Sequence, residues 1–309
     1  MSWLQQNASH GDPFTYLPKL RSFSIAWDKL ASNDGSRGLD FRNVIPYMKI
    51  SSLRSAKIVG YFDNVYFEEP DWEGMRSNVT DLTLEDCVFE GGLLGSFLVG
   101  CPSLKKLDFN HGRVTLGAGE KSNPYQPYRL WDAISHLKPC LEELVALNEW
   151  KDDSDTLYGR APFSPLPLKP ESTRLGSLAA FERLRILDTN VTVLLGSAGT
   201  NSLCLIDVLP QSLVELRLSG CRGGLLAQVC DLLNHRQRFV PVLKKITLTF
   251  PIDDAANHPE KLSSSAATAQ SGYDEKTARG LEQVCKAASI ELCINMEVTE
   301  VPMLPHPSY

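Results

Sequence analysis

The strongest constraint on the fold of this chain is that two distant segments of its sequence closely resemble each other. The segment "GGLLGSFLVGCPSLKKLDF" begins at Gly91, and "GGLLAQVCDLLNHRQRFVPVLKKITLTF" begins at Gly223. Each copy follows two alternating leucines and a cysteine, which are Leu82, Leu84 and Cys87 and then Leu216, Leu218 and Cys221. Self-similarity at a distance is typical of repeat architectures. We therefore expect a chain built from like units.

A shorter motif marks further units. The spacing Pro-x-Leu-x-x-apolar-x-apolar occurs at Pro18, Pro102, Pro139 and Pro241, whereas random placement at this composition gives roughly 0.3 occurrences. Proline cannot continue a helix, and it biases the preceding residue toward extended conformations. Each motif therefore predicts the end of a connecting helix followed by a short strand.

Each unit is predicted to contain one strand and one helix. Side chains alternate along a strand, so Leu107 and Phe109 are expected to face a core. The apolar residues of "GGLLGSFLVG" have the spacing of a one-sided helix. The second copy of this helix is longer by about two turns and keeps the same face. The last unit is predicted to have a helix from Asp274 to Ala288 and a strand near Leu292.

One inward residue in each predicted strand serves as its anchor. The anchors are Phe23, Ala56, Leu82, Leu107, Leu144, Leu187, Leu216, Ile246 and Leu292. Their uneven separations predict loop insertions at about residues 110–130, 148–180 and 251–273. We expect residues 1–309 to form a single repeat domain. We also expect nine apolar residues to share one continuous core, namely Leu82, Leu84, Leu104, Leu107, Leu144, Leu216, Leu218, Ile246 and Leu248.

Three segments, "CPSLKKLDF", "LTLEDC" and "LVELRLSGC", resemble the cysteine-containing class of leucine-rich repeats. The irregular spacing is similar to that of fungal F-box/leucine-rich-repeat proteins. The resemblance implies an α/β fold, a curved solenoid with a parallel sheet on its concave side and helices and loops on its convex side. It also implies that Cys87 and Cys221 follow their strands, where each side chain can form a hydrogen bond with the turn.

The resemblance implies a protein-protein interaction module. The alternative is the substrate-recognition part of an F-box-type ubiquitin-ligase receptor that lacks its F-box. No segment near the N-terminus matches the F-box helices, and "YLPKLRSF" already has the repeat pattern. A ubiquitin-ligase adaptor is therefore expected as a partner only if an F-box is missing from this chain.

Composition restricts the other classes of partner. The formal net charge of -6 opposes nonspecific attraction to nucleic acid or anionic membranes, so neither is expected as a partner. The sequence has no recognisable secretory signal and no apolar run of about 18 residues. We expect a cytoplasmic or nuclear location. The eight cysteines are scattered singly, which predicts reduced thiols rather than a disulfide framework.

No catalytic, cofactor-binding or metal-ligating set is recognisable. In "GAGEKS", Glu120 interrupts the Gly-Lys pair that a phosphate-binding loop needs. Asp153 and Asp155 lack the glycine and terminal glutamate of a calcium loop. The histidines are isolated, and no Cys-x-x-Cys pair is present for zinc. An enzyme with an unrecognised site is the less favoured alternative to a binding module.

Outward positions of adjacent parallel strands line up about 4.8 Å apart and therefore predict a shared binding surface. The residues are Asp81, Thr83, Glu85, Lys106, Asp108, Asn110, Glu143, Asp188, Asn190, Glu215, Arg217 and Lys245. Because acids outnumber bases, a protein partner with a basic or mixed polar face is expected. A second candidate is Trp72 in "YFEEPDWEGM", either packed on the edge of the domain or serving as an aromatic anchor with an acidic rim for a basic segment.

Overall fold

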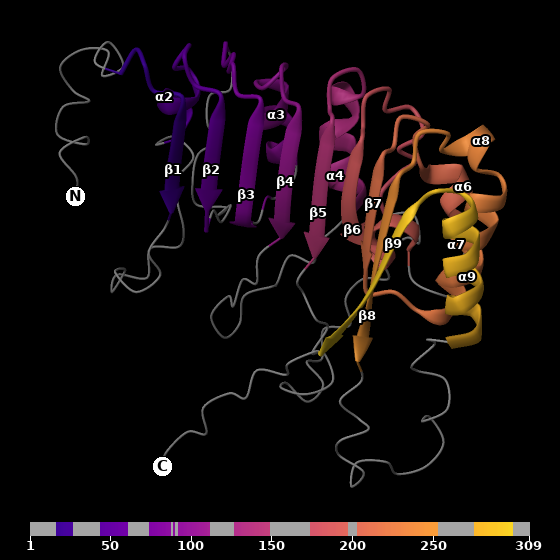
Figure 1. Ribbon diagram of the computed structural model, residues 1–309. Coiled ribbons are helices and arrows are strands. Elements are labelled where there is room, and N and C mark those ends of the chain that lie inside the picture. The colour runs from indigo at the N-terminus through magenta and orange to yellow at the C-terminus, as the bar shows by residue number, and fades with distance from the viewer. Residues whose placement is uncertain are drawn as a thin grey trace, which may run out of the picture.

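The computed structural model of the chain describes residues 17–26, 44–60, 74–87, 89, 92–111, 127–148, 174–196, 203–252 and 275–298. The strands of this part of the chain form a nine-stranded sheet that is parallel throughout and open at both edges, in the order β1 to β9 (Figure 1). They are β1 (Ser22–Ala26), β2 (Ser55–Val59), β3 (Asp81–Cys87), β4 (Lys106–His111), β5 (Glu143–Asn148), β6 (Ile186–Asn190), β7 (Glu215–Ser219), β8 (Lys245–Ile252) and β9 (Glu291–Val298). The α/β class is confirmed.

The register of the sheet follows the nine predicted anchors. Each anchor pairs directly with the anchor of the next strand, from Phe23 opposite Ala56 on β1 and β2 to Ile246 opposite Leu292 on β8 and β9. A shift of one residue in any strand would turn its apolar side chains to the opposite face. The sequence pattern thus determines which side chains face the core along the whole sheet.

The entries into strands β2 to β8 repeat one hydrogen-bond pattern. The carbonyl oxygen of Arg21 accepts bonds from the backbone N–H groups of Arg54 and Ser55 at 2.8 and 3.0 Å. The same double acceptance occurs on the next strands through the carbonyl oxygens of Arg54, Thr80, Lys105, Glu142, Arg185 and Val214. Each pair of donors is the residue before the strand and the first strand residue, so these bonds set the same register at the start of successive strands.

The described helices lie on one side of the sheet (Figure 1). They are α2 (Ile45–Met48), α3 (Leu93–Val99), α4 (Pro127–Ile134), the short 3₁₀ helix η3 (Ser135–Leu137), α5 (Val191–Leu195), α6 (Leu205–Val208), α7 (Gly223–Asn234), α8 (Arg236–Phe239) and α9 (Glu275–Ala287). The apolar faces of the longer helices belong to the same buried cluster as the inward strand residues. The helices predicted in the two sequence copies are α3 and α7, and the predicted last helix is α9.

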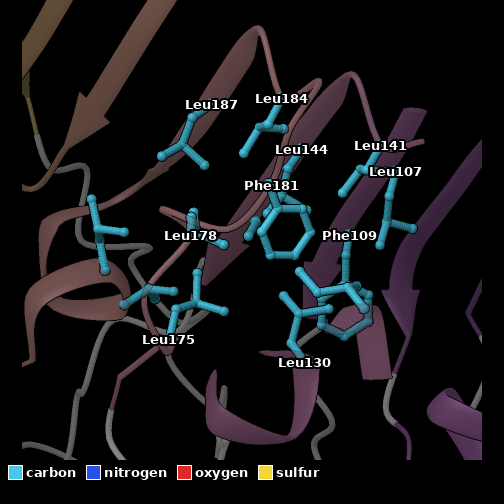
Figure 2. Close-up of a cluster of buried hydrophobic side chains, with 14 of the residues drawn as sticks. Leu107, Phe109, Leu130, Leu141, Leu144, Leu175, Leu178, Phe181, Leu184 and Leu187 are labelled. Atoms are coloured by element: carbon cyan, nitrogen blue, oxygen red, sulfur yellow. The ribbon is translucent and has the colours of Figure 1, made fainter. Parts of the chain in front are cut away.

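The core is one cluster that extends from Val44 to Ile290. All nine residues predicted to share it are at most 1 % exposed, so that prediction is confirmed. Figure 2 shows the central part, where inward strand residues such as Leu144 and Leu187 pack with residues of the connecting segments. Burial of this apolar surface is the main stabilising contribution that the fold offers.

The approximate bounds of the predicted insertions overlap described elements. Residues 127–130, in the first insertion, are the beginning of α4, where Pro127 occupies a position that proline tolerates well. In the second, Leu175 and Leu178 are fully buried and belong to the core (Figure 2). In the third, residues 251–252 end β8. The rest of these insertions, residues 112–126, 149–173 and 253–273, lies outside the described residues.

Candidate functional site

One face of the sheet carries three rows of outward side chains, which we call the polar face. The first row is Ser22, Ser55, Asp81, Lys106, Glu143, Ile186, Glu215, Lys245 and Glu291. The second is Ser24, Lys57, Thr83, Asp108, Val145, Asp188, Arg217, Thr247 and Cys293. The third is Ala26, Val59, Glu85, Asn110, Leu147, Asn190, Ser219, Thr249 and Asn295. No described helix covers this face (Figure 1).

The structure brings all twelve predicted strand residues onto the polar face, because each stands one or three positions from an anchor. The prediction missed Lys57 and Glu291, although the same counting from the anchors Ala56 and Leu292 would have found both. Trp72, the remaining predicted residue, lies outside the described residues. The assembly of a polar surface from distant parts of the sequence follows directly from the strand order.

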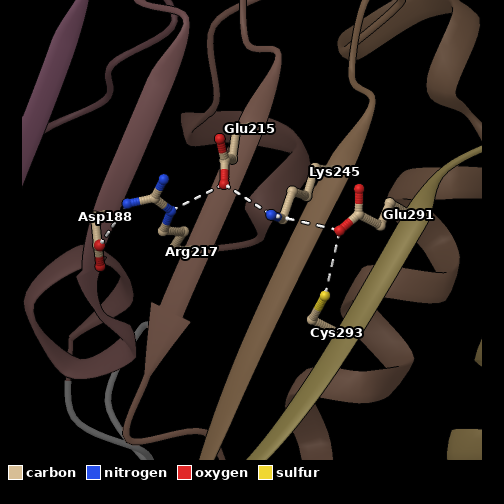
Figure 3. Close-up of polar contacts among 6 residues, drawn as sticks. All are labelled: Asp188, Glu215, Arg217, Lys245, Glu291 and Cys293. Carbon is tan, nitrogen blue, oxygen red and sulfur yellow. Dashed lines mark hydrogen bonds and ion pairs between the residues drawn. The ribbon is translucent and has the colours of Figure 1, made fainter.

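On strands β6 to β9 the charges of the polar face form a chain of alternating sign (Figure 3). The Arg217 Nε donates to Glu215 Oε1 at 2.9 Å, and its Nη1 lies 3.5 Å from Asp188 Oδ2. The Lys245 Nζ lies 3.7 Å from Glu215 Oε1 and 3.4 Å from Glu291 Oε1. Each carboxylate in this part of the face therefore has a cation beside it.

Strands β2 to β5 carry separate pairs instead of a chain. Lys57 forms an ion pair with Glu85, and the Lys106 Nζ lies 3.2 Å from Glu143 Oε2. Asp108, between these pairs on β4, has no hydrogen bond or ion pair with any described residue. Its direct neighbours in register are Thr83 on β3 and Val145 on β5. The middle of the polar face thus contains a carboxylate that the described chain does not neutralise.

The pKa values of the carboxyl groups reflect these surroundings. Partial burial, followed by the negative charges of Glu85 and Asp188, raises the pKa of Asp108, and Lys57 only partly offsets this. Partial burial also raises the pKa of Asp188 despite its contact with Arg217. The pKa of Glu215 is lowered, chiefly because it accepts the hydrogen bond from Arg217. Ionisation of Asp108 and Asp188, at the centre of the face, is therefore less favourable than that of an aspartate in water.

Of the two cysteines expected to follow their strands, Cys221 stands two positions after β7, whereas Cys87 is the last residue of β3. The Cys87 Sγ donates to the carbonyl oxygens of Glu85 and Ile58 at 3.3 and 3.5 Å, and the Cys221 Sγ donates to that of Leu218 at 3.2 Å. Burial raises the pKa of Cys221 to about 12, so its thiol stays protonated at neutral pH. All eight cysteines are free thiols.

The rest of the described chain offers little for other chemistry. It contains no group of three or more His, Cys, Asp and Glu side chains placed to hold a metal ion. In the same residues, no helix combines the length and apolar character needed to cross a membrane. The ring nitrogens of His136 and His235 each lie about 3 Å from a backbone carbonyl oxygen, at 3.1 and 3.0 Å.

Comparisons with known proteins returned no match to a family model, a curated protein or a solved structure. The polar face gathers side chains from all nine strands on the side of the sheet opposite the inward core residues. Its residues lie on a rigid parallel sheet, whose strands hold them about 4.8 Å apart. The geometry and charge of this face are therefore the basis for a functional assignment.

Proposed function

We propose that this chain is a leucine-rich-repeat solenoid that binds another protein through the polar face, which forms its concave side. Nine parallel strands in sequence order and the repeated bonds at the entries of β2 to β8 support this fold. The cysteines at the end of β3 and just after β7 support the cysteine-containing class, because each thiol donates to a carbonyl oxygen near the end of its own strand. Repeat scaffolds of this kind mainly present extended surfaces to partners.

The observation that carries the proposed function is the placement of twelve charged and polar residues, drawn from six strands, on one helix-free face. Folding requires only that outward residues be compatible with water, and it does not require acids to outnumber bases at the centre. A partner with a basic or mixed polar face fits this charge distribution, because complementary charge speeds association and disfavours wrong partners. We therefore propose a protein partner of that kind.

The test begins with affinity capture from the native cell, using the intact chain as bait. Binding of the captured protein is then measured for a chain in which Asp81, Asp108 and Glu215 are all replaced by Lys. We expect affinity to fall at least tenfold, because three attractive charges become repulsive. Undiminished affinity in a folded triple variant would place the interface elsewhere, with the Trp72 segment as the next candidate.

A matched control separates a specific surface from a general charge effect. Replacing Asp132, Glu182 and Glu282 by Lys makes the same change in net charge, and these exposed residues lie on α4, before β6 and on α9. This control is expected to bind like the wild type. Capture of a ubiquitin-ligase adaptor together with a substrate would instead favour the role of a substrate receptor.

A further inference from the structure

Three apolar side chains interrupt the polar face at its centre. From β3 to β8, the only apolar residues in the three rows are Val145 and Leu147 on β5 and Ile186 on β6. All three are half-buried, although they lie on the face that no described helix covers. An outward row of a solvated strand needs no such residues, so their clustering on two adjacent strands calls for a separate explanation.

Two carboxylates flank this apolar strip. In the second row, Val145 lies between Asp108 on β4 and Asp188 on β6, each one strand away. Because parallel strands are about 4.8 Å apart, a group placed above Val145 is roughly one strand spacing from each of these acids. We call Asp108, Val145, Leu147, Ile186 and Asp188 the central patch.

Acidic groups outnumber cations around the central patch. Asp108 has no hydrogen bond or ion pair among the described residues, and Asp188 shares Arg217 with Glu215. The charged groups that influence Asp108 are Glu85 on β3, Glu143 on β5, Asp188 on β6 and Lys57 on β2. Three of these four are acidic, and the one cation is already paired with Glu85. A further cation would therefore be attracted to this position.

We propose that the central patch receives an arginine side chain of the protein partner, with its guanidinium between Asp108 and Asp188 and its methylene groups over Val145. This inference rests on the proposed function of the polar face as a protein-binding surface. Arginine suits the patch because its planar guanidinium offers five donors and can bond two carboxylates at once. Its aliphatic stem can bury apolar surface while the charged end stays between the acids.

Other occupants fit the central patch less well. A purely apolar side chain would cover Val145 but would further desolvate Asp108 without supplying a donor. An acidic side chain would add repulsion to carboxylates whose charge is already costly. Lysine carries the charge on a single point and cannot make the parallel bonds of a guanidinium, so it is expected to bind more weakly than arginine.

The first experiment selects a random heptapeptide phage library on the intact wild-type chain and, in parallel, on its Asp108→Asn variant. We expect arginine to be enriched at one peptide position on the wild type and not on the variant. The Asp132→Asn variant, which changes an exposed acid on α4, is the matched control and is expected to select the same peptides as the wild type. Absence of a difference between wild type and Asp108→Asn would overturn the inference.

The second experiment measures the charge of the peptide directly. The selected peptide is synthesised with arginine and with citrulline, its uncharged isostere, and binding is measured by calorimetry. On the wild type, citrulline is expected to weaken binding about 10- to 100-fold, the range for loss of hydrogen bonds between charged groups. On Asp108→Asn the two peptides should differ much less, because one acceptor of the guanidinium has lost its charge.

The outcomes separate this inference from the proposed function. Selected peptides that bind wild type but not the Asp81, Asp108 and Glu215 triple variant, and that tolerate citrulline, would overturn the arginine inference and leave the polar face as the binding surface. Peptides that bind the folded triple variant as well as the wild type would overturn both. A citrulline effect that is equal on the wild type and on Asp108→Asn would also contradict the assigned position.

Discussion

On strands β6 to β9 of the polar face, Asp188, Glu215 and Glu291 each lie within 4 Å of a cation, whereas Asp108 on β4 lies beside none among the described residues. Both regions stand on the same sheet and cover the same continuous core. They differ in how the outward charges are paired. In the first region every carboxylate lies beside a cation, while the second retains a carboxylate whose charge another molecule could neutralise.

The largest expected effect on stability comes from changes in the apolar core that the two regions share. Replacing Leu107 by Ala under the β4 region, or Leu216 by Ala under the β7 region, removes a side chain that is at most 1 % exposed. Each change should lower the free energy of unfolding by about 2 to 5 kcal/mol, since it leaves a cavity in a packed core. Chemical denaturation of both variants measures this loss.

The two core variants also test whether the regions differ below the surface. Similar losses for Leu107→Ala and Leu216→Ala are expected, because both residues are anchors at equivalent positions. A midpoint that stays at the wild-type value in both would contradict the repeat register. A large loss in only one of them would show that the contrast between the regions extends into the core.

Much of this arrangement could be predicted from the sequence, because alternation of apolar residues and the Pro-x-Leu motif specify which face each strand buries. All nine anchors were predicted in their observed register. The short helices α5 and α6 were not, since they span only five and four residues and carry no periodicity long enough to recognise. The residues before β6 escaped notice for a similar reason. Leu175, Leu178 and Phe181 recur every three positions in a segment without regular structure.

Most residues of the polar face could be predicted from the sequence, but the ion pairs among them could not. The sequence places Arg217 next to Glu215 and Asp188 in register, yet the choice between partners depends on side-chain conformation and burial. The isolation of Asp108 depends on where Lys57 and Lys106 extend, and each of these turns to a different acid. Val145 was overlooked because only polar outward residues were collected.

The next effect in size tests the chain of ion pairs on β6 to β9. Replacing Arg217 by Met keeps an apolar stem and removes the cation between Asp188 and Glu215. The free energy of unfolding should fall by up to about 1 kcal/mol, the range for exposed ion pairs, and the loss should shrink as salt screens the charges. Denaturation in low and in high salt measures both quantities.

A matched variant shows whether the chain of ion pairs stabilises the fold more than a single pair does. Lys105→Met breaks the pair between Lys105 and Glu142, whose Nζ and Oε1 atoms are 3.1 Å apart outside the polar face. Because this pair is single and exposed, its loss should cost less than about 0.5 kcal/mol. A cost as large as that of Arg217→Met would show that the alternating chain on β6 to β9 adds nothing beyond its individual pairs.

The smallest expected effect has the opposite sign and concerns Asp108. Burial and neighbouring acids raise the pKa of Asp108, so the folded state disfavours its ionised form. The resulting cost to stability is absent below the unfolded-state pKa and is fully present above the raised folded-state pKa. Asp108→Asn should therefore stabilise the free chain at neutral pH, by no more than about 0.5 kcal/mol at this partly exposed site. The gain should vanish as the pH falls below the ordinary pKa of an aspartate.

Glu215 provides the comparison for that measurement because its pKa is lowered by the hydrogen bond from Arg217. Its contribution to stability is present above the unfolded-state pKa and is lost as the pH falls through the folded-state pKa. Glu215→Gln should therefore destabilise the chain at neutral pH, whereas Asp108→Asn stabilises it, and the two variants should approach wild-type stability in acid. Thermal unfolding of the three chains between acidic and neutral pH measures these trends. If Asp108→Asn were destabilising at neutral pH, Asp108 would be held by a favourable interaction in the free chain, and the contrast between the two regions of the polar face would not hold.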